Sequence, residues 1–179
     1  MISEEQIIKG CIENDRNCQK LLFKKYHSKM LGICLRYAKT RDEAEDVLID
    51  AFVSVFNKIK DFRNECNIEI WIRKITVNTA INNYRKNLKH YYHNEIENYD
   101  FYNNDLKIEM TDNMSVDEIL KLVQELPSGY RTVFNMYAIE GYSHQEISQA
   151  LGISEGTSKS QLFKARKALQ EKLNLKNKK

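Results

Sequence analysis

The sequence has little proline and glycine, with one Pro and six Gly among 179 residues. Folds with many strands need these residues at their turns, so their scarcity favours helices. No apolar run approaches the ~18 residues that a membrane-spanning helix needs. The first ten residues, MISEEQIIKG, also lack the charged-then-apolar pattern of a signal peptide. We therefore expect an all-α cytoplasmic protein without direct membrane insertion.

Cysteine patterns and ligand clusters are missing as well. No two of the four cysteines form a C-x-x-C pair, which favours reduced thiols, either in the core or at the surface. His90 and His93 have no third ligand nearby, so a metal site is the weaker explanation of this pair. No Gly-rich nucleotide-binding loop is present. The sequence therefore predicts no metal, no cofactor and no catalytic residue.

Net charge is low, at +3, but its distribution along the chain is uneven. Residues 1–88 and 119–179 are basic, whereas residues 89–118 hold two Lys/Arg against eight Asp/Glu. The net value is a weak indicator of nucleic-acid binding. The distribution, however, describes two basic blocks around an acidic middle.

Capping residues and an apolar period of three to four residues predict four helices in the first block. A capping box at Ser3 begins a short helix, and residues 18–40 follow as an amphipathic helix. Another box at Thr40 begins a third helix, and a fourth with a basic end is expected over residues 70–87. The third helix has a wide apolar stripe, formed by Ala44, Val47, Leu48, Ala51, Phe52, Val55, Phe56 and Ile59.

Between the blocks, the pattern lapses into a stretch rich in Asn, Tyr and acidic residues. It is longer than ordinary connections within a compact domain, so we predict a flexible acidic linker. The predicted architecture is two small helical domains, residues 1–88 and 115–179, joined by a linker over residues 89–114.

The second block begins with two further helices. A capping box at Ser115 starts a helix that Pro127 stops. The next helix is expected to end at Gly141, a residue suited to a C-cap. One face of this helix is apolar and carries Tyr130, Val133, Phe134 and Tyr137.

The stretch GYSHQEISQALGISEGTSKSQLFKARKAL, residues 141–169, has the outline of a helix-turn-helix. A capping box at Ser143 starts its first helix, Gly152 supplies a tight turn, and Ser154 starts the last helix. The inward-facing residues are expected to be Ile147, Ala150, Leu151, Ile153, Leu162, Ala165, Leu169 and Leu173. The candidate DNA contacts on the last helix are Thr157, Lys159, Ser160, Phe163, Lys164 and Arg166.

These candidate residues suit a major groove. Lys can donate to guanine O6 and N7, Ser can contact base edges or phosphates, and a Phe ring can meet a thymine methyl. The first helical turn also offers free N–H groups to a phosphate. A solvated basic helix that merely completes a bundle is the less favoured explanation, because the caps and turns fit a helix-turn-helix.

Taken together, the two blocks resemble a known family. LPSGYRTVFNMYAIEGYSHQEISQALGISEGTSKSQLFKARKAL resembles region 4 of bacterial sigma factors of the extracytoplasmic-function class. AEDVLIDAFVSVFNKIKDFRNECNIEIWIRKITVNTAINNYRKN resembles region 2 of the same family. The resemblance implies a factor that binds core RNA polymerase, recognises the −35 and −10 promoter elements and promotes strand opening. It also implies promoter DNA and an anti-sigma factor as partners.

For the helix that contains EDVLIDAF, the resemblance implies binding to the clamp helices of the largest polymerase subunit. The core-binding residues would be Asp46, Ile49, Asp50 and Phe52. Acidic side chains there could meet basic partner groups, although a solvated acidic face explains them nearly as well. Ile49 departs from the family, which usually has Gln, and an exposed Ile would itself mark an interface.

The loop NECN resembles the family loop that holds a base flipped out of the −10 element. The implied −10 contacts are Asn64, Glu65, Cys66, Asn67, Arg73, Asn78, Arg85 and Lys86, with the basic residues on phosphates. Cys66 departs from the small or polar residues common in that loop, so the base preference does not carry over. Trp71 could stack on a base, but its helical spacing with Ile75 favours the core.

Two other functions fit parts of the sequence. A free-standing helix-turn-helix regulator would need a dimerising or effector domain, which residues 18–88 do not resemble. A metal-dependent nuclease could use Asp42, Glu45 and Asp46, but the helix dipole already explains acids at a helix start. For the linker, nucleic-acid mimicry inside polymerase and a simple solvated tether are equally favoured.

Overall fold

Every regular element in the part of the chain that the structure describes, residues 2–92 and 115–176, is a helix. In this computed structural model, the chain divides into two compact units. Residues 1–35 with 40–82 form the first unit, and residues 36–39 with 83–179 form the second. The predicted all-α fold is confirmed. Among the described residues, no helix combines the length and apolar character needed to cross a membrane.

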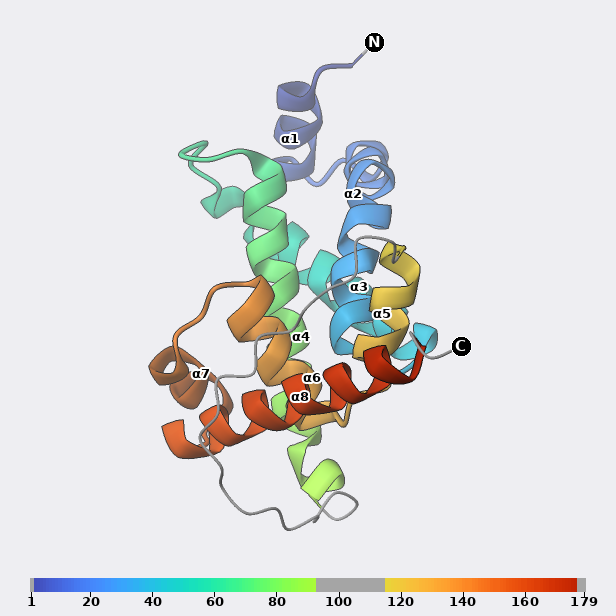
Figure 1. Ribbon diagram of the computed structural model, residues 1–179. Coiled ribbons are helices and arrows are strands. Elements are labelled where there is room, and N and C mark those ends of the chain that lie inside the picture. The colour runs from blue at the N-terminus through green and yellow to red at the C-terminus, as the bar shows by residue number, and fades with distance from the viewer. Residues whose placement is uncertain (1, 93–114, 177–179) are drawn as a thin grey trace. The chain divides into compact units, whose positions relative to one another are not determined.

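Four α-helices and one 3-10 turn make up the N-terminal part (Figure 1). They are α1 (Glu4–Ile12), α2 (Arg16–Tyr37), α3 (Arg41–Lys58), η1 (Ile59–Asp61) and α4 (Ile68–Tyr92). Ser3 and Gln6 form the expected capping box of α1. Thr40 caps α3 by accepting the N–H of Glu43 at 3.2 Å. The side-chain caps therefore start α1 and α3 where the sequence predicted.

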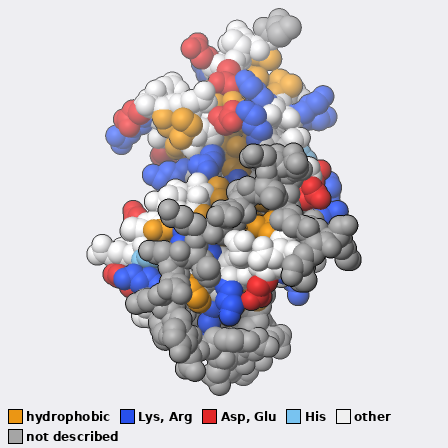
Figure 2. Space-filling view, viewed as in Figure 1, with side chains coloured by type: hydrophobic (Ala, Val, Ile, Leu, Met, Phe, Trp, Pro, Cys, Tyr) orange, Lys and Arg blue, Asp and Glu red, His pale blue; other side chains and the backbone are white. Residues whose placement is uncertain are grey.

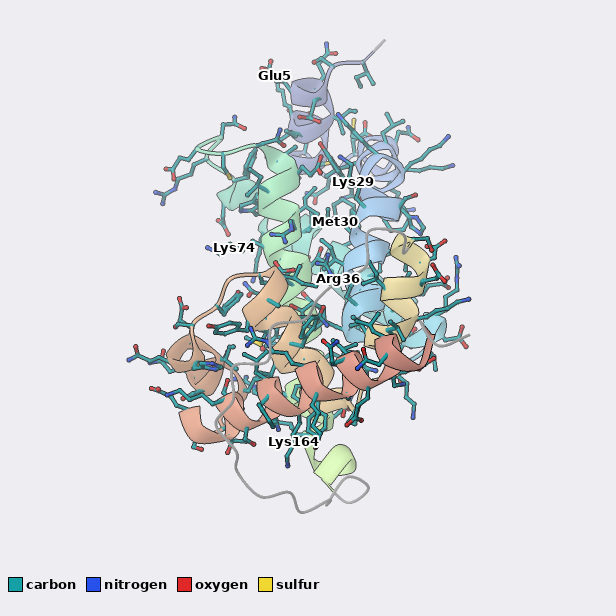
Figure 3. The ribbon with its side chains drawn as sticks, viewed as in Figure 1. Glu5, Lys29, Met30, Arg36, Lys74 and Lys164 are labelled. Carbon is teal, nitrogen blue, oxygen red and sulfur yellow. The ribbon has the colours of Figure 1, made fainter. Side chains whose placement is uncertain are left out.

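The core of the first unit is apolar. Leu22 and Met30 of α2, Leu48 of α3 and Ile72 of α4 have at most 2% of their surface exposed. In Figure 3, Met30 lies among the helices, whereas Glu5 extends from α1 into solvent. The predicted stripe of α3 is buried except for Phe56, which is half-buried. Burial of such side chains contributes about 1.5–3 kcal/mol each, which makes this core the main stabiliser of the unit.

Three cysteines are part of this core, and one is not. Cys11, Cys18 and Cys34 are buried free thiols, whereas Cys66 is exposed. Burial raises the pKa of Cys11 to about 11, so this thiol stays protonated at neutral pH. The expectation of reduced core and surface thiols agrees with these positions.

The C-terminal part contains shorter helices packed on one long helix (Figure 1). They are α5 (Val116–Gln124), α6 (Ser128–Phe134), the π-helix η2 (Asn135–Ile139), α7 (His144–Leu151) and α8 (Glu155–Lys176). A core cluster joins α5 to α8 and consists of Leu122, Val123, Leu126, Ala165, Leu169 and Leu173. Tyr130 and Phe134 pack against this cluster. Among the residues predicted to face inward, Ala150 and Ile153 are half-buried and the others are buried.

The predicted turns of this part are confirmed, but one helix differs from its prediction. Gly141 and Gly152 have φ of +78° and +69°, which only glycine adopts at little cost. After Phe134 the backbone widens into a π-helix, in which Glu140 N–H bonds to Asn135 O at 3.0 Å. The wider turn rotates later residues away from the face that 3.6 periodicity predicts. Tyr137 is consequently 36% exposed, not on the apolar face with Val133.

The end of α4 also differs from the prediction. The helix continues to Tyr92, four residues into the segment predicted to be a linker. Residues 93–114, the remainder of that segment, lie outside the described residues, and His93 is among them.

Candidate nucleic-acid and partner interfaces

The helix-turn-helix is built from local caps on both helices. Ser143 and Glu146 form the capping box of α7, and the N–H of Gly152 bonds to Ser148 O at 2.9 Å in the turn. Ser154 Oγ accepts the N–H of Thr157 at 3.0 Å, and the two hydroxyl oxygens lie 2.9 Å apart. The Thr157 hydroxyl thus belongs to the cap of α8, a contact that the assignment of Thr157 to DNA did not anticipate.

The other predicted −35 contacts differ in exposure. Lys159 is exposed, whereas Ser160 and Phe163 are half-buried. Lys164, labelled on α8 in Figure 3, is half-buried. Its ammonium lies 6.0 Å from the centre of the Tyr130 ring. The Arg166 guanidinium lies 5.7 Å from the Tyr137 ring. Lys159 is therefore the candidate with the most accessible side chain, and the two other cations lie beside aromatic rings.

A partly buried polar contact joins α8 to α7. Ser158 has none of its surface exposed, and its Oγ lies 2.9 Å from Nδ1 of His144 at the start of α7. The Tyr137 ring stacks on the imidazole with a centroid distance of 4.6 Å. Burial lowers the pKa of His144, and the charge of Lys159 lowers it further. This pair was not predicted from the sequence, although Ser158 does interrupt the apolar stripe one turn before Leu162.

The loop that precedes α4 is exposed over residues 63–67. Asn64 has φ of +56°, a left-handed conformation that Asn tolerates better than most residues. The Oδ1 of Asn67 accepts the N–H of Glu69 at 2.8 Å, so this side chain starts α4. Glu65 and Cys66 are exposed between these two residues. The loop therefore presents three side chains to solvent and uses the fourth predicted contact as a helix cap.

The exposed face of α4 follows this loop. Arg73, Asn78, Arg85 and Lys86 are all exposed, as the assignment to DNA requires. Lys74 also extends outward from the helix (Figure 3). Ile70, in the first turn, is 60% exposed and was not predicted as a contact.

Trp71 is neither in the core nor fully free to stack on a base. It is half-buried, and its ring lies 5.4 Å from that of Phe62. Trp71 therefore lies at the edge of the core, which agrees only in part with its predicted place there.

The outer face of α3 combines acidic and apolar side chains. Asp46 and Asp50 are exposed, Ile49 is 57% exposed and Val53, one turn later, is 53% exposed. Val53 was not among the predicted contacts, although it lies four residues after Ile49 on the same face. The departure of Ile49 from the family thus coincides with an exposed apolar pair.

The position of Phe52 in α3 differs from the one that the resemblance implied. It was assigned to the polymerase surface, but it is only 2% exposed and packs edge-on against Phe23 with ring centroids 4.7 Å apart. The apolar stripe of α3 turns Phe52 into the core, where it cannot contact a partner. Its burial therefore argues against the assignment of Phe52 to core-polymerase binding.

Charges of both signs are mixed on the face of the molecule seen in Figure 2.

The carboxylates of the nuclease hypothesis do not form a metal site. Glu45, one of the three, pairs with Arg41 at 2.8 Å. Within residues 2–92 and 115–176, no group of three or more His, Cys, Asp or Glu side chains could hold a metal ion. These contacts leave the nuclease hypothesis without a described ligand set.

Comparison with known proteins connects these surfaces to a family. The Sigma-70 region 2 family matches residues 22–90, and the Sigma-70, region 4 family matches residues 116–169. The chain is 27% identical over 180 residues to the RNA polymerase sigma-H factor of Pseudomonas aeruginosa, covering 95% of this chain and 93% of the relative. It is 25% identical over 182 residues to the ECF RNA polymerase sigma-E factor of Haemophilus influenzae, covering 96% of each.

Among solved structures, the chain is similar to the sigma factor RpoE of Bartonella quintana, which was solved in complex with the anti-sigma factor NepR. The identity is 21% and the TM-score 0.49, over 87% of this chain and 96% of that chain.

Both sigma regions are therefore present in one chain, in the order that the sequence predicted. Sigma factors are non-enzymatic subunits through which RNA polymerase recognises promoters and initiates transcription. This result excludes the free-standing regulator and the nuclease as the main function. The chain belongs to the sigma-70 family and is an extracytoplasmic-function sigma factor with region 2 and region 4 domains.

Proposed function

We propose that the two sigma regions of this chain divide promoter recognition between duplex and single-stranded DNA. Helix α8 binds the −35 element in the major groove, and the loop before α4 captures a base of the −10 element. Helix α3 binds the clamp helices of the largest polymerase subunit. The observation that carries this proposal is the presence of both regions in one chain, each with at least one proposed contact residue exposed, such as Lys159 in region 4 and Asp50 in region 2.

For the −35 element, exposure supports Lys159 as the principal base contact. A Lys ammonium can donate to guanine O6 and N7. Ser160, Phe163, Lys164 and Arg166 contribute neighbouring base or phosphate contacts from half-buried positions. Thr157 stays in the proposed set as a neighbour of these contacts, although its hydroxyl and its N–H both bond to Ser154 Oγ in the cap.

For the −10 element, the exposed loop supports capture of an unstacked base. Asn64, Glu65 and Cys66 offer side chains of different hydrogen-bonding character to the base edge. Holding a flipped base offsets the few kcal/mol that unstacking costs, so strand opening follows from binding without ATP. The exposed cations of α4 hold phosphates of the same strand.

For core polymerase, the mixed face of α3 supports two kinds of contact. Asp46 and Asp50 meet basic groups of the partner, which increases specificity and the rate of association. Ile49 and Val53 add an apolar contact of a kind that forms the centre of protein interfaces. Replacing Phe52 with Val53 in the predicted set makes all its members exposed.

The remaining assignments follow from this function. We keep the domain limits of residues 1–88 and 115–179, with residues 89–114 connecting them. An anti-sigma factor, common for this class, is the proposed regulatory partner. The cytoplasm, where the polymerase works, is the proposed location.

The decisive experiment is run-off transcription with purified core polymerase on genomic fragments, followed by mapping of start sites. We expect transcripts whose upstream sequences share a −35 and a −10 element. Transcription that never depends on the added protein would contradict the proposal.

Asp50→Lys tests the α3 surface separately. Charge reversal should lower affinity for core polymerase about tenfold or more, because a rim or interface charge would then face basic partner groups. Glu5→Lys, which reverses an exposed charge on α1, is the matched control and should leave affinity unchanged. Equal co-elution of both variants with core polymerase would exclude α3 as the docking surface.

A further inference from the structure

A buried serine hydroxyl in α8 requires a partner. Ser158 lies one turn before Leu162, at a position where the stripe of α8 is otherwise apolar, and none of its surface is exposed. A buried hydroxyl without a hydrogen bond destabilises the fold. The 2.9 Å contact with Nδ1 of His144 supplies this bond. The contact therefore links the first residue of α7 to the second turn of α8.

The imidazole is itself held in place. Tyr137 of η2 stacks on it with an interplanar angle of 23°, and Arg166 of α8 lies beside the same Tyr ring. Three elements of the domain thus meet around His144: the start of α7, the π-helix and two positions of α8. Such contacts on both sides of a hydrogen bond restrict the rotation of α8 about its axis.

We propose that His144 is a positioning residue for −35 recognition, which acts through Ser158 to fix how α8 presents Lys159 to the major groove. Ser158 is buried and Lys159 is exposed, so the bond that holds one residue orients its neighbour. Base readout depends on donor placement, and a small roll of the helix would misplace the ammonium. The inference rests on the proposed role of α8 at the −35 element.

The electrostatic surroundings of His144 give this role a pH dependence. Burial, Lys159 and Arg166 lower the pKa of the imidazole from its usual 6.5, whereas Glu155 raises it, and the uncharged Tyr137 ring covers one face. The ring is therefore neutral at pH 7.5, and its Nδ1 can accept a hydrogen bond from the Ser158 hydroxyl. Once protonated, both of its nitrogens only donate, and a third positive charge faces Lys159 and Arg166. Recognition of the −35 element should change as the pH falls through this lowered pKa.

The test uses the full chain with core polymerase on a mapped promoter and on its single-base −35 variants. His144→Phe keeps a ring against Tyr137 but removes the hydrogen bond, and Ser158→Ala removes the hydroxyl without adding volume at this buried position. Each single change should lower discrimination between matched and mismatched −35 bases about fivefold. The double variant should lose no more than either single one, because the two act through one contact.

The double variant also guards against loss of folding. It leaves no buried hydroxyl or imidazole without a partner, so it provides a folded protein for the assay even if a single variant fails to fold. Gln145→Ala, at the exposed neighbour of His144, is the control and should keep full discrimination. Unchanged discrimination in His144→Phe or in the folded double variant would overturn the inference and reduce the contact to a structural one.

Two further arms separate this inference from the function on which it rests. Wild-type discrimination should change as the pH falls from 7.5 through the lowered pKa of His144, and His144→Phe should abolish that change whereas His27→Gln should retain it. A pH response that persists in His144→Phe would overturn the inference. If Lys159→Ala leaves discrimination intact, the assignment of α8 to the −35 element fails as well. If it removes discrimination while His144→Phe does not, only the positioning role fails.

Discussion

The two units of this sigma factor place their polar side chains differently. Among the described residues, the first unit buries one polar side chain, Thr76, and exposes five large apolar ones: Ile2, Leu21, Ile49, Val53 and Ile70. The second unit buries several polar side chains, among them Arg131, Asn135 and Ser158. Its core is thus partly built from hydrogen bonds, whereas the core of the first unit is apolar.

Helix length explains this difference. Helices α2, α3 and α4 have 22, 18 and 25 residues, so most of their backbone groups bond within the helix. Helices α5, α6 and α7 have nine, seven and eight residues, and each leaves up to four carbonyls unsatisfied at its end. Arg131 donates to one such carbonyl, Gln124 O at 2.8 Å, and to Leu126 O just beyond α5 at 3.2 Å. Buried polar side chains such as Arg131 therefore supply hydrogen bonds at the ends of short helices. A unit built mainly from long helices has fewer such ends to satisfy.

Arg131→Met should produce the largest effect and would test this explanation. The substitution keeps an extended side chain but leaves buried carbonyls without their donor, which we expect to cost about 2–4 kcal/mol. Urea unfolding followed by hydrogen exchange in α5 and α6 would measure the loss.

Thr76→Val in the first unit is the matched change for Arg131→Met. Thr76 Oγ1 donates to Ile72 O at 3.0 Å, a carbonyl that also belongs to the helical backbone ladder. Removing that hydroxyl should cost less than about 1 kcal/mol, because no backbone group becomes unpaired. Equal losses for the two substitutions would mean that buried polar groups have the same role in both units.

Lys159→Ala should have the next largest effect and concerns function rather than folding. We expect a loss of ~1–3 kcal/mol at one matched −35 base, with relaxed choice at that position. Binding of the polymerase complex to −35 variants would measure it. Lys167→Ala, an exposed lysine on the same helix, should instead weaken all sequences alike. A uniform loss for Lys159→Ala would make Lys159 a phosphate contact.

Local sequence signals predicted the second unit in detail. Capping boxes at Ser115 and Ser143, and left-handed glycines at 141 and 152, all lie where the sequence placed them. Each signal depends on residues within four positions of one another, so the sequence alone contains it. The contact between His144 and Ser158 joins residues fourteen positions apart, and no local rule predicts such a pair.

The first unit shows a different limit of prediction. Periodicity correctly placed Phe52 in the apolar stripe of α3, but the resemblance assigned the same residue to the polymerase surface, and burial supports periodicity. Val53 and Ile70 were missed because an isolated apolar residue on a polar face gives no periodic signal. The π-helix after Phe134 was missed as well, since it depends on packing rather than on composition.

Asn64→Gly should affect strand opening, by less than Lys159→Ala affects −35 recognition. Glycine adopts the left-handed φ of Asn64 freely, so the substitution keeps the loop path and removes only the side chain. Loss of one hydrogen bond to a captured base is worth about 1 kcal/mol, or roughly fivefold in open complex. Permanganate reactivity of the −10 strand would measure it.

Asn14→Gly is the matched control for this loop. Asn14 has a similar φ of +63° in the turn before α2, but it is not part of the proposed DNA surface. Its replacement should leave strand opening unchanged. Equal losses for the two glycine variants would trace the effect to backbone freedom and remove Asn64 from the proposed base contacts.

Glu4→Gln should have the smallest effect, because the first unit keeps this polar contact at its surface. Hydrogen bonds from Lys25 and Tyr26 lower the pKa of Glu4 below its usual 4.5. The stabilisation is therefore present above pH 4.5 and is lost as the pH falls through the lowered pKa. For an exposed pair we expect less than about 1 kcal/mol at pH 7. Hydrogen exchange of α1 at pH 7 should be faster in Glu4→Gln than in the exposed control Glu5→Gln. The exchange rates of the two variants should become equal in acid. A difference that persists at low pH would mean that packing, rather than charge, stabilises the contact.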